Sequence, residues 1–190
     1  MKKLLGILVL GLLLSGNAYT DDISDFQIEG ISIGDSALDH FDKKELKKQK
    51  NRFKSKKYDK YCSKKFTTYV DLCFYTKAKD SSYIIESIAG FEDFSDNIAA
   101  CYKEQNATDK ELKSLFEDAK RKVDDYKHGA DKTGQSTERD IIYVLNSGGE
   151  VGTACIDWGK KFTKKHKTYD HLQLFIDSQE YANFLKNEAW

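Results

Sequence analysis

Four cysteines are the residues whose possible chemistry the sequence constrains most directly: Cys62, Cys73, Cys101 and Cys155. No two of them have the C-x-x-C spacing of zinc and redox motifs, so we expect no metal and no cofactor. An even number of cysteines indicates disulfides if the chain is exported, as the N-terminal pattern described next indicates. Four cysteines allow three pairings. We prefer Cys101–Cys155, a helix tied to a late strand, with Cys62–Cys73 as a local link; the alternative is free, buried thiols.

The N-terminus indicates export, and therefore an oxidising compartment. Met1–Lys3 is positively charged, Leu4–Leu14 is apolar, and the residues that follow are small and mildly polar. This three-part plan is typical of a secretory signal peptide. The alternative is a membrane anchor, but the apolar run is shorter than the ~20 residues that span a bilayer.

We therefore predict a signal peptide at residues 1–20, cleaved after Ala18 or Thr20, and a mature α+β domain at residues 21–190. No later stretch is long and apolar enough to cross a membrane. The mature protein is expected to be periplasmic or secreted.

A serine hydrolase is a second chemistry to consider. Gly34-Asp35-Ser36 follows a predicted strand and precedes a predicted helix, and Asp125 and His128 form a D-x-x-H block. Both blocks resemble those of the GDS(L) lipases and esterases. The resemblance implies that Ser36 is the nucleophile and His128 its base, in a triad with Asp125.

The chain departs from that family in three ways. Ala37 stands where the family usually has Leu, the mature chain lacks the Gly-x-Asn-Asp block, and hairpins dominate where the family has a parallel sheet. The competing interpretation is that Asp35 or Ser36 caps a short helix. We prefer the cap and keep the hydrolase as the alternative.

Two histidines and one Asp-Lys-Thr-Gly segment are further candidates for metal binding or catalysis. His166, Asp170 and His171 include only two imidazoles, with lysines around them, so we interpret them as surface residues. Asp131–Gly134 is interpreted as a turn.

Charge is segregated along a chain of 190 residues whose formal net charge is zero. Residues 43–65 and 160–167 hold seventeen Lys or Arg and two acids, so the rest of the mature chain is acidic. If the two stretches meet in space, they form a positive patch that attracts a polyanion, such as an anionic lipid or an envelope polymer. The alternative is a solvated surface, and no nucleic-acid motif is present. The predicted patch comprises Lys54, Lys56, Lys57, Lys60, Lys64, Lys65, Lys160, Lys161, Lys164 and Lys165.

Hydrophobic periodicity predicts a single α+β fold. Alternation predicts strands at 26–33, 66–76, 83–91, 141–145, 151–158 and 172–176, with a glycine-containing hairpin at 146–150. Helical spacing predicts helices at 94–105, at 108–123 after a Thr108–Glu111 capping box, and after Ser178. We expect a largely antiparallel sheet of about six strands with helices packed on one face.

Two segments resemble small exported proteins of unknown function from Pelagibacter-type marine alphaproteobacteria: Ile28–Ser36 with Phe41, and Asp131–Gly134 leading to Ala154–Trp158. That resemblance implies no activity and transfers no site residues. The Ile-x-x-Gly start is also similar to lipoprotein-type modules of the outer-membrane assembly machinery, which are α+β binding modules, although no lipobox cysteine is present. We therefore expect a non-catalytic binding or envelope-associated module that contacts an anionic envelope component or a protein partner.

Overall fold

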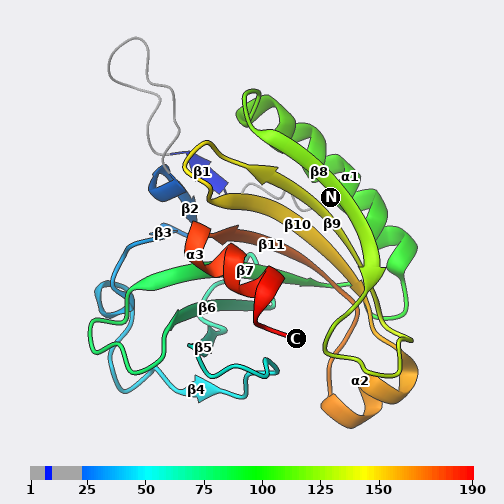
Figure 1. The fold of residues 1–190 in the computed structure, drawn as a ribbon, viewed down its shortest axis with the longest axis horizontal. Helices are drawn as coiled ribbons and strands as arrows, with labels where there is room; N and C mark the ends of the chain where they lie inside the picture. The colour runs from blue at the N-terminus through cyan, green and yellow to red at the C-terminus, as the bar shows by residue number, and fades with distance from the viewer. Residues whose placement is uncertain (1–6, 10–22) are drawn as a thin grey trace.

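The computed structural model describes residues 7–9 and 23–190, and most of these residues build one large antiparallel sheet. Its eight strands lie in the order β4-β5-β6-β7-β11-β10-β9-β8 (Figure 1). Their bounds are β4 Lys48–Gln49, β5 Tyr58–Ser63, β6 Asp71–Lys77, β7 Ile85–Asp93, β8 Lys120–Lys127, β9 Thr137–Val144, β10 Glu150–Asp157 and β11 His171–Asp177. The α+β class and the antiparallel sheet are confirmed, but the predicted count of about six strands is too low.

A second, three-stranded sheet packs against the large one. It contains β1 (Ile7–Val9), β2 (Phe26–Ile28) and β3 (Ile31–Ser32), and the 3-10 helices η1 (Ile23–Asp25) and η2 (Ala37–Asp39) flank it. Apart from β1, the predicted signal peptide lies outside the described residues. Within the described residues, no helix is both long and apolar enough to span a bilayer.

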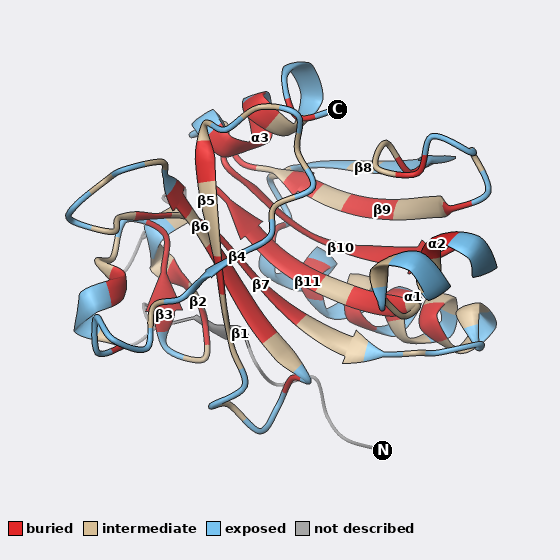
Figure 2. Cartoon of the chain, turned by 90° about the horizontal axis from the view of Figure 1, so that it is seen from below, coloured by how far each residue is buried: buried red, intermediate tan, exposed pale blue. Residues whose placement is uncertain are grey.

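One face of the large sheet, called here the α1 face, holds the main hydrophobic core. Helix α1 (Ile98–Leu115) crosses it and buries a stripe of Cys101, Gln105, Thr108 and Leu112. Leu112 joins side chains of β2, β3 and the middle strands in a continuous apolar cluster. Figure 2 shows that buried residues run along the middle strands of the sheet. Burial of this apolar surface is the largest favourable contribution to folding.

The opposite face, called the α3 face, carries the other two helices. Helix α3 (Gln179–Asn187) places Tyr181 and Phe184 against Tyr58 of β5. Helix α2 (Lys160–His166) places Phe162 in a separate cluster with Ala154 of β10. The expectation that helices pack on one face is therefore wrong, because successive residues of each strand alternate between two buried faces.

The predicted helix at 108–123 is wrong as a separate element, because residues 108–115 are part of α1 and residues 120–123 belong to β8. Helix α1 begins at Asn97, whose side chain accepts a hydrogen bond from the Ala100 amide at 3.1 Å, and continues without a break past Thr108. The Thr108 hydroxyl donates to the Glu104 carbonyl instead of capping a new helix. Residues 120–127 then form β8, an edge strand without a buried apolar face, so its sequence has no alternation to detect.

Strand bounds differ from prediction in the first half of the sheet. The predicted strand at 66–76 begins only at Asp71, and the strand expected at 83–91 runs from Ile85 to Asp93. Strand β5 lies inside the basic stretch and was not predicted, because two polar residues, Asp59 and Lys60, separate its buried Tyr58 and Tyr61 and break a strand's alternation. The hairpin of β9 and β10 agrees with prediction, and Gly148 has the positive φ that such a turn requires.

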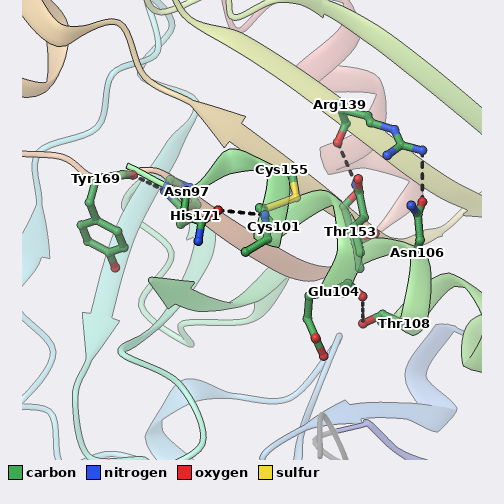
Figure 3. Close-up of a disulfide and its surroundings, with 12 residues drawn as sticks. Asn97, Cys101, Glu104, Asn106, Thr108, Arg139, Thr153, Cys155, Tyr169 and His171 are labelled. Carbon is green, nitrogen blue, oxygen red and sulfur yellow. Dashed lines mark hydrogen bonds between the residues drawn. A yellow bond between two sulfur atoms is a disulfide. The ribbon is translucent and has the colours of Figure 1, made fainter. Parts of the chain in front are cut away.

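Both preferred disulfide pairings are present. Cys101–Cys155 ties α1 to the middle of β10, and Cys62–Cys73 joins directly opposed residues of β5 and β6. The first bridge closes a sequence separation of 54 residues and the second closes 11. Figure 3 shows Cys101–Cys155 beneath α1, next to the buried Thr153.

Removing the two bridges is expected to have unequal costs. In the chain-entropy model, the longer loop gives the larger stabilisation, about 4 kcal/mol against about 3 kcal/mol. We expect Cys101→Ala/Cys155→Ala to lower the free energy of unfolding more than Cys62→Ala/Cys73→Ala, as measured by denaturant titration. Equal losses in the two double variants would contradict this expectation.

Asp177, at the end of the central strand β11, is a buried acid. Its neighbour across the β10–β11 ladder is Glu150, and its side chain is 4% exposed. Burial is the main cause that raises its pKa to about 8, and the charge of Glu150 adds to this effect. The native state therefore holds a proton that the unfolded chain has already released at neutral pH.

A pH dependence of stability follows from Asp177. Because its native pKa is raised, its favourable contribution is complete at low pH and is lost as the pH rises towards 8. We expect Asp177→Asn to reduce the fall in unfolding free energy between pH 7 and 8 by about 1 kcal/mol. Asp118→Asn, at an exposed acid, is the control; the same change in both variants would rule out Asp177 as its source.

Candidate functional site

The two basic stretches meet on the α3 face. The Arg52 guanidinium carbon lies 5.2 Å from the Trp158 ring centroid and 5.5 Å from that of Phe162. Arg52 thus stacks at cation–π distance over the segment that begins α2. The chain around Arg52 is held in place at the Lys54 amide, which donates to the Ala189 carbonyl at 2.9 Å.

A row of aromatic rings lies beneath Arg52. Trp158 and Phe162 stack with centroids 4.6 Å apart and an interplanar angle of 7°, and His166 lies 4.2 Å from Phe162. Trp158 is fixed through its backbone amide, which donates to Asp170 Oδ1 at 2.8 Å. Gly159, the residue before α2, donates to the Ser136 hydroxyl at 3.0 Å. These bonds make the aromatic row a fixed support for the cations above it.

Lys60 extends the same surface along β5. Its Nζ lies 5.7 Å from the centroids of both Tyr75 and Phe91, two rings that come from neighbouring strands. We call Arg52, Lys60 and the four α2 lysines, with the rings under them, the basic–aromatic surface; the α2 lysines are Lys160, Lys161, Lys164 and Lys165, all exposed.

Other members of the predicted patch lie elsewhere. Lys57 is shared between Glu180 at 3.6 Å and Glu188 at 3.5 Å, and Lys64 lies 3.9 Å from Asp71. Lys65 stacks over Phe41, in the core of the α1 face. Lys54 and Lys56 are exposed on the segment that leads to β5. The structure therefore brings together part of the ten-lysine set, with Arg52, absent from that set, at the contact.

Cations of the basic–aromatic surface are not neutralised locally. Over residues 23–190, no ion pair within 4.0 Å is found for Arg52, Lys60 or the four α2 lysines. Nearby acids are engaged in other contacts: Asp170 accepts from Trp158, and Asp131 accepts from Ser136 and Thr133. These hydrogen bonds lower the pKa of Asp131 and hold the turn predicted at this segment.

Two buried histidines at this face are neutral. Burial is the main cause that lowers the pKa values of His128 and His171 to about 4, and the charge of Arg52 contributes to both shifts. His128 Nδ1 accepts from the Ala130 amide at 3.0 Å, so the ring proton lies on Nε2. His171 Nδ1 is 2.7 Å from the Tyr169 carbonyl and therefore carries the proton (Figure 3). Both imidazoles act as packing groups.

Metal binding finds no support at these residues. His166 packs on Phe162, His171 bonds to a carbonyl, and Asp170 holds the Trp158 amide. In the part of the chain that the structure describes, no three His, Cys, Asp or Glu side chains are grouped to hold a metal ion. His171 is buried, contrary to the expectation of a surface residue.

Ser36 is placed as a helix cap and not next to a base. Its hydroxyl donates to the Ser82 carbonyl at 2.7 Å and accepts from the Leu38 amide at 3.2 Å, at the start of η2. Asp35 accepts from the Ser32 amide and contacts His40. Asp125 and His128 belong to the β8 region at the far edge of the sheet. His128 packs against Trp158 at 4.4 Å, so the described contacts do not join Ser36 to His128.

A cluster of buried acids beneath β8 was not predicted from the sequence. Glu138 and Asp140 lie two residues apart on β9, on the α3 face, and Tyr126 donates to Asp140 at 2.6 Å. Burial raises the pKa of Asp140 to about 7 and also raises that of Glu138. The alternation of acids with Ile141 and Tyr143 is the only signal that could have located them.

Comparison with protein-family models, with curated proteins and with solved structures found no match for this chain. The resemblances noted in the sequence therefore stay predictions, and the site has to be interpreted from its own chemistry.

Ser36 is expected to contribute only structurally, through the cap on η2 and its hydrogen bond to the Ser82 carbonyl. Replacing it with Ala removes both hydrogen bonds and should lower the free energy of unfolding by about 1–2 kcal/mol. Ser81→Ala, at an exposed serine of the neighbouring loop, is the matched control for thermal denaturation. Hydrolysis of a short-chain ester by the unmutated protein, lost in Ser36→Ala, would contradict a purely structural role.

Proposed function

We propose that the protein is an exported, non-catalytic binding module whose basic–aromatic surface attaches to an anionic component of the cell envelope. The ligand chemistry is phosphate, displayed repeatedly on a surface of lipid headgroups. One observation carries the proposal: Arg52 stacks on Trp158 and Phe162, which joins two basic stretches that are about a hundred residues apart in the sequence.

Composition of the surface favours an extended anion over a single bound phosphate. Lysine ammonium groups act as mobile point charges, whereas a closed phosphate site usually uses the bidentate fork of arginine. Four of the cations stand on α2, a helix of seven residues, and all four are exposed. Such an arrangement suits many simultaneous, weak contacts with a charged plane.

Aromatic rings add a second component. Trp158 is 5% exposed and Phe162 is 9% exposed, so the rings do not insert into a membrane but support the cations above them. Neutral His128 and His171 complete this support without adding charge. Attraction should therefore be mainly electrostatic and sensitive to salt.

Export is part of the proposal. Two disulfides and the lack of a membrane-spanning helix among the described residues are compatible with a periplasmic or secreted protein. The proposed location itself rests on the N-terminal sequence pattern, which is typical of a signal peptide.

Cosedimentation with vesicles tests the proposal. We expect the protein to pellet at low salt with vesicles that contain phosphatidylglycerol, not with vesicles of phosphatidylcholine alone, and to be released at high salt. Each lysine at a membrane surface contributes about 1 kcal/mol, so replacing Lys160, Lys161, Lys164 and Lys165 with Gln should weaken binding by up to about a thousandfold.

The matched control removes the same net charge from a different place. Lys103, Lys110 and Lys113 are exposed lysines of α1, on the opposite face of the sheet from α2, and Lys79 is an exposed lysine between β6 and β7. Replacing these four with Gln should leave pelleting unchanged. Failure of the unmutated protein to pellet at low salt, or equal loss in both variants, would refute a dedicated surface. Soluble polyphosphate, added as a competitor, tests an anionic polymer as the alternative ligand.

A further inference from the structure

Strand β8 leaves one long edge of the large sheet unpaired. It is the last strand in the sheet order, and no other described element pairs with its outer side. It pairs with β9 in continuous register over all eight residues. By contrast, the opposite edge is β4, a strand of only two residues.

Open edges of this length usually carry a protective device, because free N–H and C=O groups attract other strands. Proline residues and β-bulges are two such devices, and β8 has neither. A third device is charged side chains, which β8 does carry. Its sequence is Lys-Arg-Lys-Val-Asp-Asp-Tyr-Lys, with cations before Val123 and acids after it. Charges in this order do not repel a second copy that runs in the opposite direction.

We propose that β8 pairs antiparallel with β8 of a second copy of this chain, about a two-fold axis that passes beside Val123. The axis that relates two antiparallel strands of one sheet is normal to the sheet, so opposed residues share a face. With Val123 opposite itself, Lys122 faces Asp124 and Arg121 faces Asp125 of the other copy. Lys120 faces Tyr126, a cation and a ring.

Neighbouring registers are unfavourable, which makes the proposal specific. A shift in one direction centres the axis on Lys122 and sets two ammonium groups opposite each other. The other direction centres it on Asp124 and opposes two carboxylates. Opposed like charges destabilise a strand pair, whereas opposite charges and apolar pairs stabilise it. Of these three registers, only the one centred on Val123 has attractive pairs on both faces.

The exposure of side chains on β8 agrees with an edge that a second copy covers. Val123 is 40% exposed and Tyr126 is 44% exposed, so a second copy that pairs with β8 would cover both side chains. Arg121 is already held by Asp109 at 2.8 Å, so it is ordered before a partner arrives. Helix α1 packs mainly on β10 and β11, and the ion pair of Asp109 with Arg121 connects it to β8.

Charge reversal and its repair test the pairing. We expect the native protein to have twice the monomer mass by light scattering, in a concentration-dependent equilibrium. Lys122→Asp places a carboxylate opposite Asp124 of the other copy at two symmetric positions in the dimer. This repulsion should raise the dissociation constant about tenfold or more. Lys122→Asp/Asp124→Lys exchanges the two charges and should restore the native dimer, which a merely structural effect of the single change would not do.

Cross-linking tests the register without altering any charge. Val123→Cys should form a disulfide-linked dimer in oxidising buffer, because the two copies of residue 123 are opposed. Lys127→Cys is the control, since the axis puts its two copies about 26 Å apart at ~3.3 Å per residue. A native protein that stays monomeric at every concentration, a single reversal without effect, or equal cross-linking of the two cysteine variants would overturn the proposal.

Discussion

Attachment of α1 to the middle of the sheet is the constraint on which the rest of the fold depends. The chain leaves β7 near the centre and has to reach β8 at the edge, so α1 passes over three strand positions that are filled later in the sequence. The Cys101–Cys155 bridge and the Gln105 amide, which donates to the Arg139 and Thr153 carbonyls, hold the crossing in place. Strand β11 then enters between β10 and β7, and the two halves become one sheet (Figure 1).

Sequence patterns located the elements that bury mainly apolar side chains, and missed those that bury polar side chains or almost none. The hairpin of β9 and β10 has two apolar runs joined by a glycine turn, so the sequence predicts it. Helix α1 buries the polar residues Gln105 and Thr108, whose side chains donate to backbone carbonyls, so its buried stripe is not a continuous apolar pattern and the predicted start and end are misplaced. Strand β8 contributes almost nothing to the core, and a pattern based on burial could not show it (Figure 2).

Local chemistry was more predictable than long-range contact at the candidate site. The capping role of Ser36 and the turn at Asp131 depend on residues nearby in the sequence, and both were expected. The contact between Arg52 and Trp158 joins segments that only the folded sheet brings together. The sequence therefore predicts a positive patch only on the condition that the two basic stretches meet. The burial of acids such as Asp140 was not predicted for the same reason, since it depends on residues that are distant in the sequence.

The buried carboxyls have a consequence for the charge that the folded molecule presents to its surroundings. Equal numbers of acidic and basic residues give the full chain a formal charge of zero and a calculated isoelectric point near 6.9. Asp177 is protonated at neutral pH, and Asp140 is partly so. Native protein should therefore focus at a more alkaline position in an electric field than the same polypeptide in urea, where every carboxyl titrates normally. Folding itself makes this molecule more cationic than its composition states.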